Sequence, residues 1–273
     1  MDSKGTRMDN FDSSAYLKRL NLSAPVEPTV EGLRTLQKAQ FLTIPFENFD
    51  ILLGRGIDLD PEHQFDKLVH RPRGGYCFEL SGLFLRALQT FGFKARALLA
   101  RVHLAGKPSG RGHQLSLVLV EGRRWVVDVA FGKDNPRGPV PLELDTVQEF
   151  NGVQYRLADG GRCGTMLQKR GDDDWRNLYS FDMEYVFPAD IDYGNHYTST
   201  SPHTFFTRDR VAIKPLEDGI VTLHNYRLTV TRNGQKMSEE LPEGQRYLDA
   251  LKIHFGIELD APCEALKPIA QKD

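Results

Sequence analysis

The spacing of apolar residues changes abruptly after Gly92. From Leu80 to Phe91 apolar side chains recur every three or four residues, which is typical of the buried face of a helix, and Gly92 suits the position after its end. From Phe93 onward the chain has short β-rich runs separated by glycine-containing turns. Helices followed by strands favour an α+β fold, with the strands forming an antiparallel sheet or barrel.

We expect three parts, a helical part at 1–92, a strand-rich part at 93–190 and a mixed part at 191–273. Two further helices are predicted, one through Leu20 and one from Thr29 to about Phe41 that Pro45 terminates. The predicted strands are 95–104, 114–120, 124–130, 155–157, 164–169 and 175–179, and the mixed part has a hairpin over 219–231 and a helix over 242–255.

Composition excludes several classes of protein. A formal net charge of -2 gives no basic surface for nucleic acid, and no apolar stretch approaches the roughly 20 residues of a membrane helix. The first twelve residues lack the apolar core of a secretion signal. The three cysteines argue against a disulfide framework and fit the cytoplasm, and no CxxC or HxxxH pair indicates a metal site.

Cys77 is the strongest candidate for a reactive residue. It follows Gly74-Gly75-Tyr76 and lies where the helix ending at Phe91 begins. Unpaired N–H groups and the helix dipole favour an anion in the first turn, and the thiolate is the nucleophilic form of cysteine. Cys163 and Cys263 have no such context, so we interpret them as small apolar residues. Cys77 therefore requires a matching base.

His113 and Asp128 can supply that base and its orienting acid. If Glu121-Gly122 form a two-residue hairpin loop, the numbers of paired residues add to 243. His113 and Asp128 then emerge on the same face as diagonal neighbours, about 7–8 Å apart. A three-residue loop would place them on opposite faces. Asp128 also interrupts an apolar run, and a buried carboxylate needs a partner.

Each of these residues also has a structural interpretation. Asp128 by itself fits a hydrogen-bonded aspartate near a turn, and a histidine at the end of a strand is often a surface residue. His103 has no matching carboxylate, so we prefer His113. The agreement of the cues for Cys77, His113 and Asp128 favours a Cys-His-Asp catalytic triad.

Four ordered motifs resemble those of the arylamine N-acetyltransferases, over most of the chain. They are Arg-Gly-Gly-Tyr-Cys-Phe-Glu from Arg73, Pro-Phe-Glu-Asn from Pro45, Gly-His before an apolar strand at His113, and Asp-Val-Ala-Phe-Gly from Asp128; a further block, 198–202, is similar. The family commonly has Asn at the position of Ser81 and Gly at the position of Ala130. These departures affect the expected substrate preference more than the reaction type.

The resemblance implies an α+β fold with an N-terminal helical bundle, a central antiparallel β-barrel and a C-terminal α/β lid, around a catalytic core like that of cysteine proteases. It also implies ping-pong transfer of acetyl from acetyl-CoA to arylamines, hydrazines or N-hydroxyarylamines, without a metal. Cys77 would carry the acetyl group, His113 would act as the base and Asp128 would orient it. Backbone N–H groups near Cys77 and Gly112 would bind the oxyanion.

The resemblance also assigns binding residues. Ser109 and Gly110 would contact coenzyme A, although a plain flexible loop is the simpler interpretation of this segment. Phe46, Phe131 and Phe206 would line the acceptor pocket, although phenylalanine is more often core. Glu47 and Arg73 would form a structural ion pair beneath the site.

Proteins with other functions can carry the same Cys-His-Asp triad. A papain-like or transglutaminase-like cysteine hydrolase would use water as the acceptor, but Arg-Gly-Gly-Tyr-Cys is not the signature of those enzymes. An amide synthase that acylates an aromatic amine with a polyketide chain would need no acetyl-CoA. A binding protein with an inactive triad is the third alternative, and the intact residues argue against it.

Overall fold

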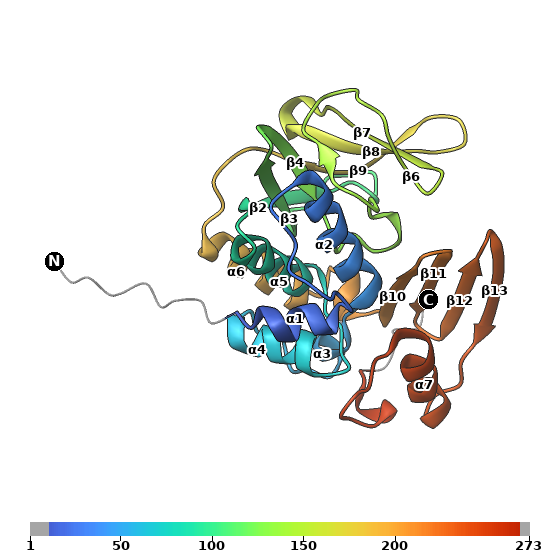
Figure 1. The fold of residues 1–273 in the computed structure, drawn as a ribbon. Coiled ribbons are helices and arrows are strands. Elements are labelled where there is room, and N and C mark those ends of the chain that lie inside the picture. Colours follow the sequence, from blue (N-terminus) through green and yellow to red (C-terminus); the bar gives the residue numbers. More distant parts are fainter. Residues whose placement is uncertain (1–10, 268–273) are drawn as a thin grey trace.

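The computed structural model describes residues 11–267. The outer ends of the predicted first and third parts, and most of the N-terminal stretch considered above, lie outside these residues. In Figure 1 the barrel strands, green to yellow, and the C-terminal sheet, orange to red, lie on different sides of the N-terminal helices. The predicted order of helices, barrel and further sheet is confirmed.

The first part contains three short helices and two helices of 14 residues, of which the second carries Cys77. They are α1 (Ser13–Arg19), α2 (Val30–Thr43), α3 (Phe49–Leu52), α4 (Pro61–Phe65) and α5 (Cys77–Thr90), and a π-helical turn at Asp66–His70 follows α4. The hydroxyl oxygen of Thr29 accepts a hydrogen bond from the N–H of Gly32 at 3.1 Å and so caps α2. The positive φ of 83° at Gly92 fits its predicted position after α5.

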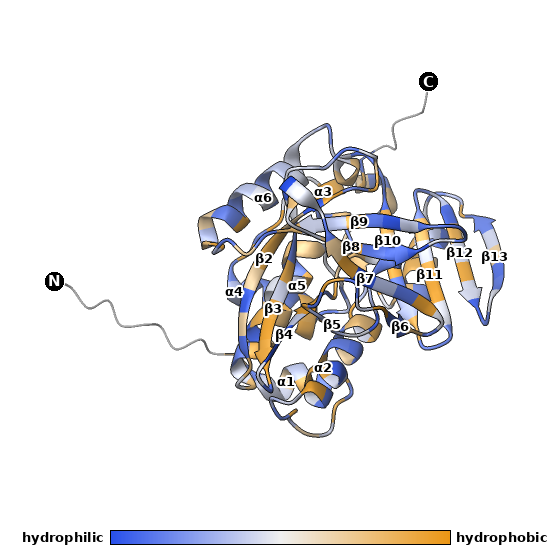
Figure 2. Ribbon diagram, turned by 90° about the horizontal axis from the view of Figure 1, so that it is seen from above, coloured by the Kyte–Doolittle hydropathy of each residue, from blue (hydrophilic) through white to orange (hydrophobic). Residues whose placement is uncertain are grey.

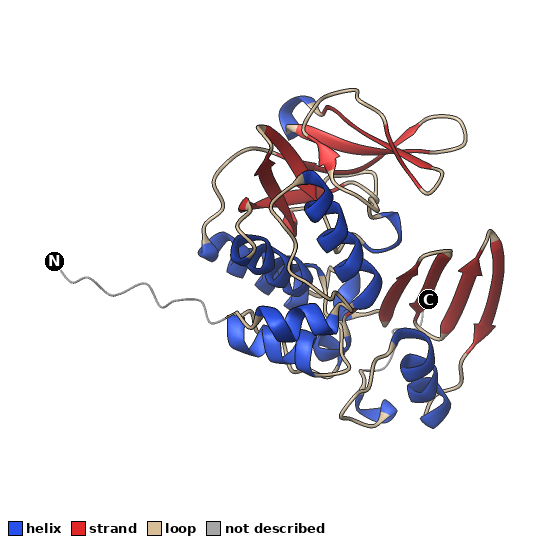
Figure 3. Ribbon diagram, viewed as in Figure 1, coloured by secondary structure: helices blue, strands red, loops and turns tan. Residues whose placement is uncertain are grey.

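The second part is an antiparallel sheet of eight strands that closes almost completely into a barrel (Figure 3). The strands are β2 (Lys94–Val102), β3 (Arg111–Val120), β4 (Arg123–Val127), β5 (Val140–Pro141), β6 (Gln148–Phe150), β7 (Val153–Asp159), β8 (Thr165–Arg170) and β9 (Trp175–Phe181). Their order across the sheet is β5-β4-β3-β2-β9-β8-β7-β6. The predicted antiparallel barrel is therefore confirmed.

The helix α6 (Pro188–Thr200) spans the expected boundary between the second and third parts, and the third part continues as a second antiparallel sheet. Its elements are β10 (Val211–Leu216), β11 (Gly219–His224), β12 (Arg227–Arg232), β13 (Gln235–Glu240) and α7 (Gln245–Ala250), which a π-helical turn at Leu251–Phe255 extends. The predicted hairpin is confirmed, because His224 pairs with Arg227 across a two-residue loop. The short strand β1 (Phe46–Glu47), from the first part of the chain, pairs with β10.

The core that positions the site lies between α5 and the strands β2 to β4. Leu80, Leu83 and Phe84 of α5 are buried there with Val118 of β3 and Val127 of β4. Figure 2 shows the matching apolar segments in orange along these strands. Separate apolar clusters fill the barrel and the space between the C-terminal sheet and α7. Packing of α5 on β3 thus fixes the start of the helix relative to His113.

Candidate active site

Cys77 is the first residue of α5 and its side chain is buried. Two glycines allow the chain to approach the helix closely. A Cβ at Gly74 would lie 2.1 Å from the carbonyl oxygen of Pro45, and a Cβ at Gly75 would lie 2.9 Å from the carboxylate of Glu79. No other residue type fits either position without moving the backbone or the helix cap. The predicted location of Cys77 in the first helical turn is confirmed.

The hairpin of β3 and β4 has the predicted register. Val120 pairs with Arg123 and Ser116 pairs with Val127, so the paired numbers add to 243. Glu121 and Gly122 both have positive φ, 50° and 72°, as a two-residue turn of this kind requires. The ladder ends at Ser116 and Val127, so the predicted strand through Ala130 is too long and Asp128 lies just after β4. The hydrogen bond between the side chains of His113 and Asp128 confirms that they meet, as predicted.

His113 and Asp128 form a buried hydrogen-bonded pair. Nε2 of His113 lies 2.7 Å from Oδ2 of Asp128, and the two residues are 3% and 2% exposed. The second carboxylate oxygen of Asp128 accepts a hydrogen bond from the N–H of Ala130 at 2.8 Å. Because a carboxylate only accepts hydrogen bonds, Nε2 carries a proton and Nδ1 is the nitrogen available to another partner.

Cys77 is that other partner of the imidazole. Burial opposes a positive charge on His113, but the charge of Asp128 and hydrogen bonds to Asp128 and Cys77 outweigh it and raise the pKa of His113 to about 10. His113 is therefore an imidazolium at neutral pH, and it lies beside the side chain of Cys77. The three predicted residues meet at one point in the fold.

Cys77 also lies close to the strand that carries His113. Its sulfur is 3.8 Å from the carbonyl oxygen of Gly112, and the hydroxyl of Ser81 donates a hydrogen bond to the carbonyl oxygen of Gln114 at 2.7 Å. The N–H of Gly112 donates to the carbonyl of Gly110 at 2.8 Å. The N–H of Gly112 is therefore engaged in a closed turn, and the expectation that backbone N–H groups near Cys77 and Gly112 bind the oxyanion stays a prediction.

The predicted aromatic residues are near the triad. Phe131 contacts the ring of His113 edge-on, with the ring centres 5.0 Å apart. The ring centres of Phe46 and Phe206 are 5.9 Å apart, and Phe206 also meets Tyr76, which precedes the nucleophile, at 5.8 Å. Aromatic side chains thus lie against His113 and against Tyr76, the residue before Cys77.

Ser109 and Gly110 lie in the loop between β2 and β3. The hydroxyl of Ser109 accepts a hydrogen bond from the N–H of Val102 at 2.8 Å and donates to the carbonyl of Gly110 at 2.7 Å. These bonds hold the loop against the end of β2. His103, the alternative base, lies 2.9 Å from the hydroxyl of Ser180 and has no carboxylate partner.

Sequence reasoning missed the groups that hold the Asp128 loop. The side-chain amides of Gln37 and Asn135 both donate to the carbonyl oxygen of Asp128, at 2.9 and 2.7 Å. Tyr179 is fully buried with its ring centre 5.3 Å from that of His113, and its hydroxyl bonds to Asp128. Gln37 is a buried polar residue of α2.

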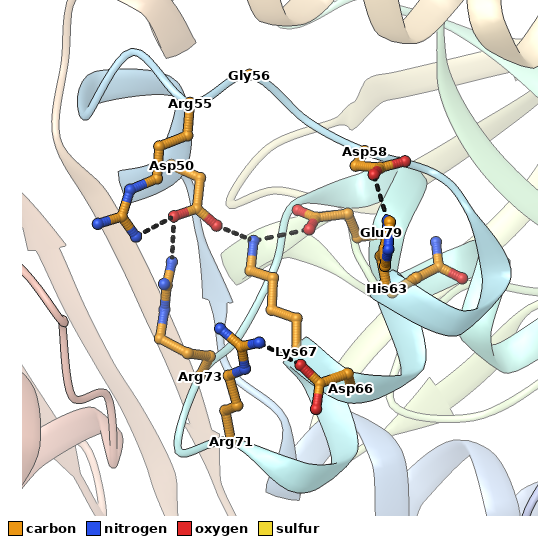
Figure 4. A pocket seen from close by; sticks show the side chains of 11 residues that line it. Asp50, Arg55, Gly56, Asp58, His63, Asp66, Lys67, Arg71, Arg73 and Glu79 are labelled. Atoms are coloured by element: carbon orange, nitrogen blue, oxygen red, sulfur yellow. Dashed lines mark hydrogen bonds and ion pairs between the residues drawn. The ribbon is translucent and has the colours of Figure 1, made fainter.

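A charged network lies on the other side of the start of α5 (Figure 4). Nε of Arg73 donates to Glu47 at 2.9 Å, which confirms the predicted ion pair, and Asp50 and Lys67 extend the network to Glu79. A cavity of about 240 Å³ adjoins it, lined by Asp50, Arg55, Gly56, Asp58, His63, Gln64, Asp66, Lys67, Arg71, Arg73 and Glu79. No member of the triad lines this cavity.

The matching fold and sequence identify the family. The N-acetyltransferase family profile matches residues 29–263. The arylamine N-acetyltransferase / N-hydroxyarylamine O-acetyltransferase of Salmonella typhimurium is 38% identical over 248 residues, which cover 89% of this chain and 88% of that protein. The chain belongs to the arylamine N-acetyltransferase family.

Solved structures of arylamine N-acetyltransferases have the same fold. The Salmonella typhimurium enzyme superposes with a TM-score of 0.86 at 37% identity, covering 89% of this chain and 90% of that one. The Mycobacterium marinum arylamine N-acetyltransferase in complex with CoA gives 0.84 at 35% identity, covering 90% and 93%. The α+β prediction and the resemblance stated from the motifs are both confirmed.

Three further observations concern metal-binding groups, membrane-spanning helices and cysteines. Within residues 11–267 no cluster of three or more His, Cys, Asp or Glu side chains is arranged to hold a metal ion. In the same range no helix is both long and apolar enough to cross a membrane. Cys77, Cys163 and Cys263 are all free thiols.

Proposed function

We propose that this enzyme transfers an acetyl group from acetyl-CoA to the nitrogen of arylamines and arylhydrazines, and to the oxygen of N-hydroxyarylamines. The observation that carries the proposal is the position of His113 between the buried carboxylate of Asp128 and the thiol of Cys77. Family membership supports the donor and acceptor classes, because a relative is named for both acceptor types and another was solved with CoA.

In the first half of the reaction, the thiolate of Cys77 attacks the carbonyl carbon of the thioester. The bond from that carbon to the sulfur of coenzyme A breaks, and His113 gives its proton to the departing sulfur. Cys77 then carries the acetyl group, and His113 is neutral with its Nε2 proton still held by Asp128.

In the second half, the amine nitrogen attacks the acetyl carbon on Cys77. The neutral His113 accepts a proton from the nitrogen at Nδ1, and the Cys77 thiolate leaves beside the regenerated imidazolium. The buried position of the pair excludes most water, which favours the amine over hydrolysis. Asp128 remains charged throughout and fixes the ring orientation.

We assign the acceptor and donor sites by the same reasoning. Phe46, Phe131 and Phe206 would hold a flat aromatic acceptor, supported by their contacts around Tyr76 and His113. Ser109 and Gly110 would contact coenzyme A through backbone groups, since the Ser109 hydroxyl is already bonded within the loop. Three free thiols support a cytoplasmic location.

The first test is intact-protein mass spectrometry after mixing with acetyl-CoA and again after adding an anisidine. An acetyl-sized adduct that disappears as acetylated anisidine forms is the expected result, and Cys77→Ala should form none while retaining its circular dichroism spectrum. Release of acetate without any amine would indicate a hydrolase instead. If acetyl-CoA forms no adduct although an alkylating reagent modifies Cys77 readily, the amide synthase would be favoured.

A further inference from the structure

A buried carboxylate caps the helix that carries the nucleophile. Glu79 is 2% exposed, and its Oε2 accepts a hydrogen bond from the N–H of Tyr76 at 3.0 Å. The absence of a side chain at Gly75 admits this carboxylate, since a Cβ there would lie 2.9 Å from Oε2. Glu79 therefore stabilises the backbone turn from which Cys77 projects.

The same carboxylate presents an electrostatic difficulty. Glu79 and Cys77 both lie in the first turn of α5, and although their side chains point to different faces of the helix, a buried negative charge on Glu79 opposes a second anion in the same turn. Burial raises the pKa of Glu79, although the ammonium of Lys67 opposes that rise. Without a cation nearby, a charged Glu79 would disfavour the thiolate of Cys77, and a thiolate would disfavour the charged form of Glu79.

Lys67 supplies the cation from a different element. It lies in the π-helical turn Asp66–His70, and its Nζ is 2.7 Å from Oε1 of Glu79 and 2.6 Å from Oδ2 of Asp50. Asp50 is itself held by Arg73 at 3.0 Å, so the ammonium has a fixed position (Figure 4). Burial opposes the charge of Lys67, but the surrounding carboxylates outweigh it and raise its pKa.

We propose that Lys67 is a positioning residue for the cysteine nucleophile. Its ammonium neutralises the carboxylate of Glu79, so that the first turn of α5 can hold this charged cap and the thiolate of Cys77 at the same time. The proposal rests on the proposed function, in which Cys77 is the nucleophile. Lys67 does not line the aromatic site and acts only through Glu79.

The other charged groups near Glu79 do not replace Lys67. Glu47, on β1, adds negative charge and raises the pKa of Glu79 further. Asp50, on α3, is also negative, and Arg73 is engaged by Glu47 and Asp50. At the N-cap position before α5, the backbone N–H of Tyr76 donates a hydrogen bond to Glu79. Lys67 is thus the cation in direct contact with the cap.

The test measures thiolate formation separately from acetyl transfer. Alkylation of the Cys77 peptide by iodoacetamide is followed against pH by mass spectrometry in Lys67→Met, Glu79→Gln and the double variant. Lys67→Met should raise the midpoint of the pH profile by about one unit, a tenfold loss of thiolate below the midpoint. The double variant should return the midpoint to that of the wild type, because the neutral amide still caps the helix.

Controls separate this role from a loss of folding. Lys38→Met removes an exposed lysine paired with Glu217 and should leave the midpoint unchanged. Lys67→Arg should restore most of the acetyl transfer that Lys67→Met loses, since the adjoining cavity of about 240 Å³ has room for the larger cation. Glu79→Gln alone retains Lys67 and should have a midpoint no higher than the wild type.

Several results would overturn the proposal. An unmoved midpoint in Lys67→Met, a midpoint still raised in the double variant, or a raised midpoint in Glu79→Gln would each do so. The last result is informative even if Lys67→Met does not fold. If alkylation follows the expected pattern but no variant and no wild-type protein transfers acetyl, the proposed function fails and the role of Lys67 stands.

Discussion

Asp128 is held in place from several directions. Its two carboxylate oxygens accept hydrogen bonds from His113 and from the N–H of Ala130, and its main-chain oxygen accepts from Gln37 and Asn135. A rotation of this side chain would break at least one buried hydrogen bond, and leaving a buried group unpaired costs about 1–3 kcal/mol. The orientation of the imidazole therefore follows from a rigid support.

Replacing Asp128 by Asn should abolish most activity without unfolding the protein. An amide can present a donor to Nε2, which selects the wrong imidazole tautomer and removes the charge that stabilises the imidazolium. A loss of about 10⁴-fold in kcat accompanies this change in a serine protease triad, and we expect a similar magnitude here. Stopped-flow acetylation of Cys77 measures it directly. Asp173→Asn in an exposed loop is the matched control, and equal rates for both variants would contradict the assignment.

The raised pKa of His113 also predicts a pH dependence of stability. Between the ordinary pKa of 6.5 and the folded value of about 10, the folded protein holds a proton that the unfolded chain has lost. The stabilisation is therefore complete below pH 6.5 and is lost as pH rises toward 10. As pH rises through this range, the free energy of unfolding of the wild type should fall relative to that of His113→Gln by up to about 1.4 kcal/mol per pH unit, as measured by urea unfolding. Parallel curves would disprove the charged state of His113.

Some site residues could be predicted from the sequence and others could not. Cys77, His113 and Asp128 could be found because a glycine pair, a strand start and a break in an apolar run are all local patterns. Tyr179 comes from β9, at the far side of β2 from β3, and nothing in its own segment indicates that it meets Asp128. Contacts between distant segments depend on barrel closure, which no local pattern encodes.

The hairpin of β3 and β4 is the element that assembles the triad. Its register is predicted from the length of the loop and is confirmed. The predicted strand 124–130 is too long, since β4 ends at Val127 and the carbonyl of Asp128 accepts hydrogen bonds from side-chain amides instead of a neighbouring strand. By contrast, the pairing of β1 with β10 was not predicted, because a two-residue strand carries no periodic signal. Two buried glutamines of α2 are explained only by their hydrogen-bond partners, which no local pattern indicates. Gln37 bonds to Asp128, and Gln40 bonds to the carbonyl of Leu80.

Adding one methyl group to the turn of this hairpin should destabilise the protein. Gly122 has a φ of 72°, and a Cβ at this position would have no atom within 4 Å, so Gly122→Ala introduces backbone strain and no collision. We expect a loss of about 1–2 kcal/mol in the free energy of unfolding, measured by urea titration. Gly110→Ala, also without neighbours and without a positive φ, should cost less. Equal losses would show that strain at the turn is not the cause.

At the scale of the whole molecule, we propose the division 1–92, 93–190 and 191–273 as structural parts that fold together. The sheet of the third part includes β1 from the first, and near the C-terminal end of the described chain the N–H of Lys267 donates to the carbonyl of Leu52 at 2.9 Å. Arg210 stabilises the same region. It is 1% exposed, lies between Tyr226 and Tyr247, and donates to Glu243 and to the carbonyl of Lys267.

Arg210→Met should therefore loosen the C-terminal sheet and the chain that follows it. Loss of hydrogen bonds from a buried charged group and of the contacts with two aromatic rings should cost about 2–3 kcal/mol, read from urea unfolding. Hydrogen exchange should quicken in β10 to β12 more than in β2 to β4. Arg227→Met, which removes an exposed arginine 3.7 Å from Glu240, is the control and should cost less than about 1 kcal/mol. An equal increase in hydrogen exchange in both groups of strands would contradict a stabilising role of Arg210 that is local to the C-terminal sheet.

The two-residue turn at Glu121 and Gly122 has a consequence for engineering. Exposed loop tips are the usual places to insert an epitope tag or a reporter, because added length there rarely matters. At this tip one added residue changes the alternation of β4 and turns Asp128 away from His113. The length of a surface loop remote from the catalytic chemistry is thus as constrained as the identity of the nucleophile.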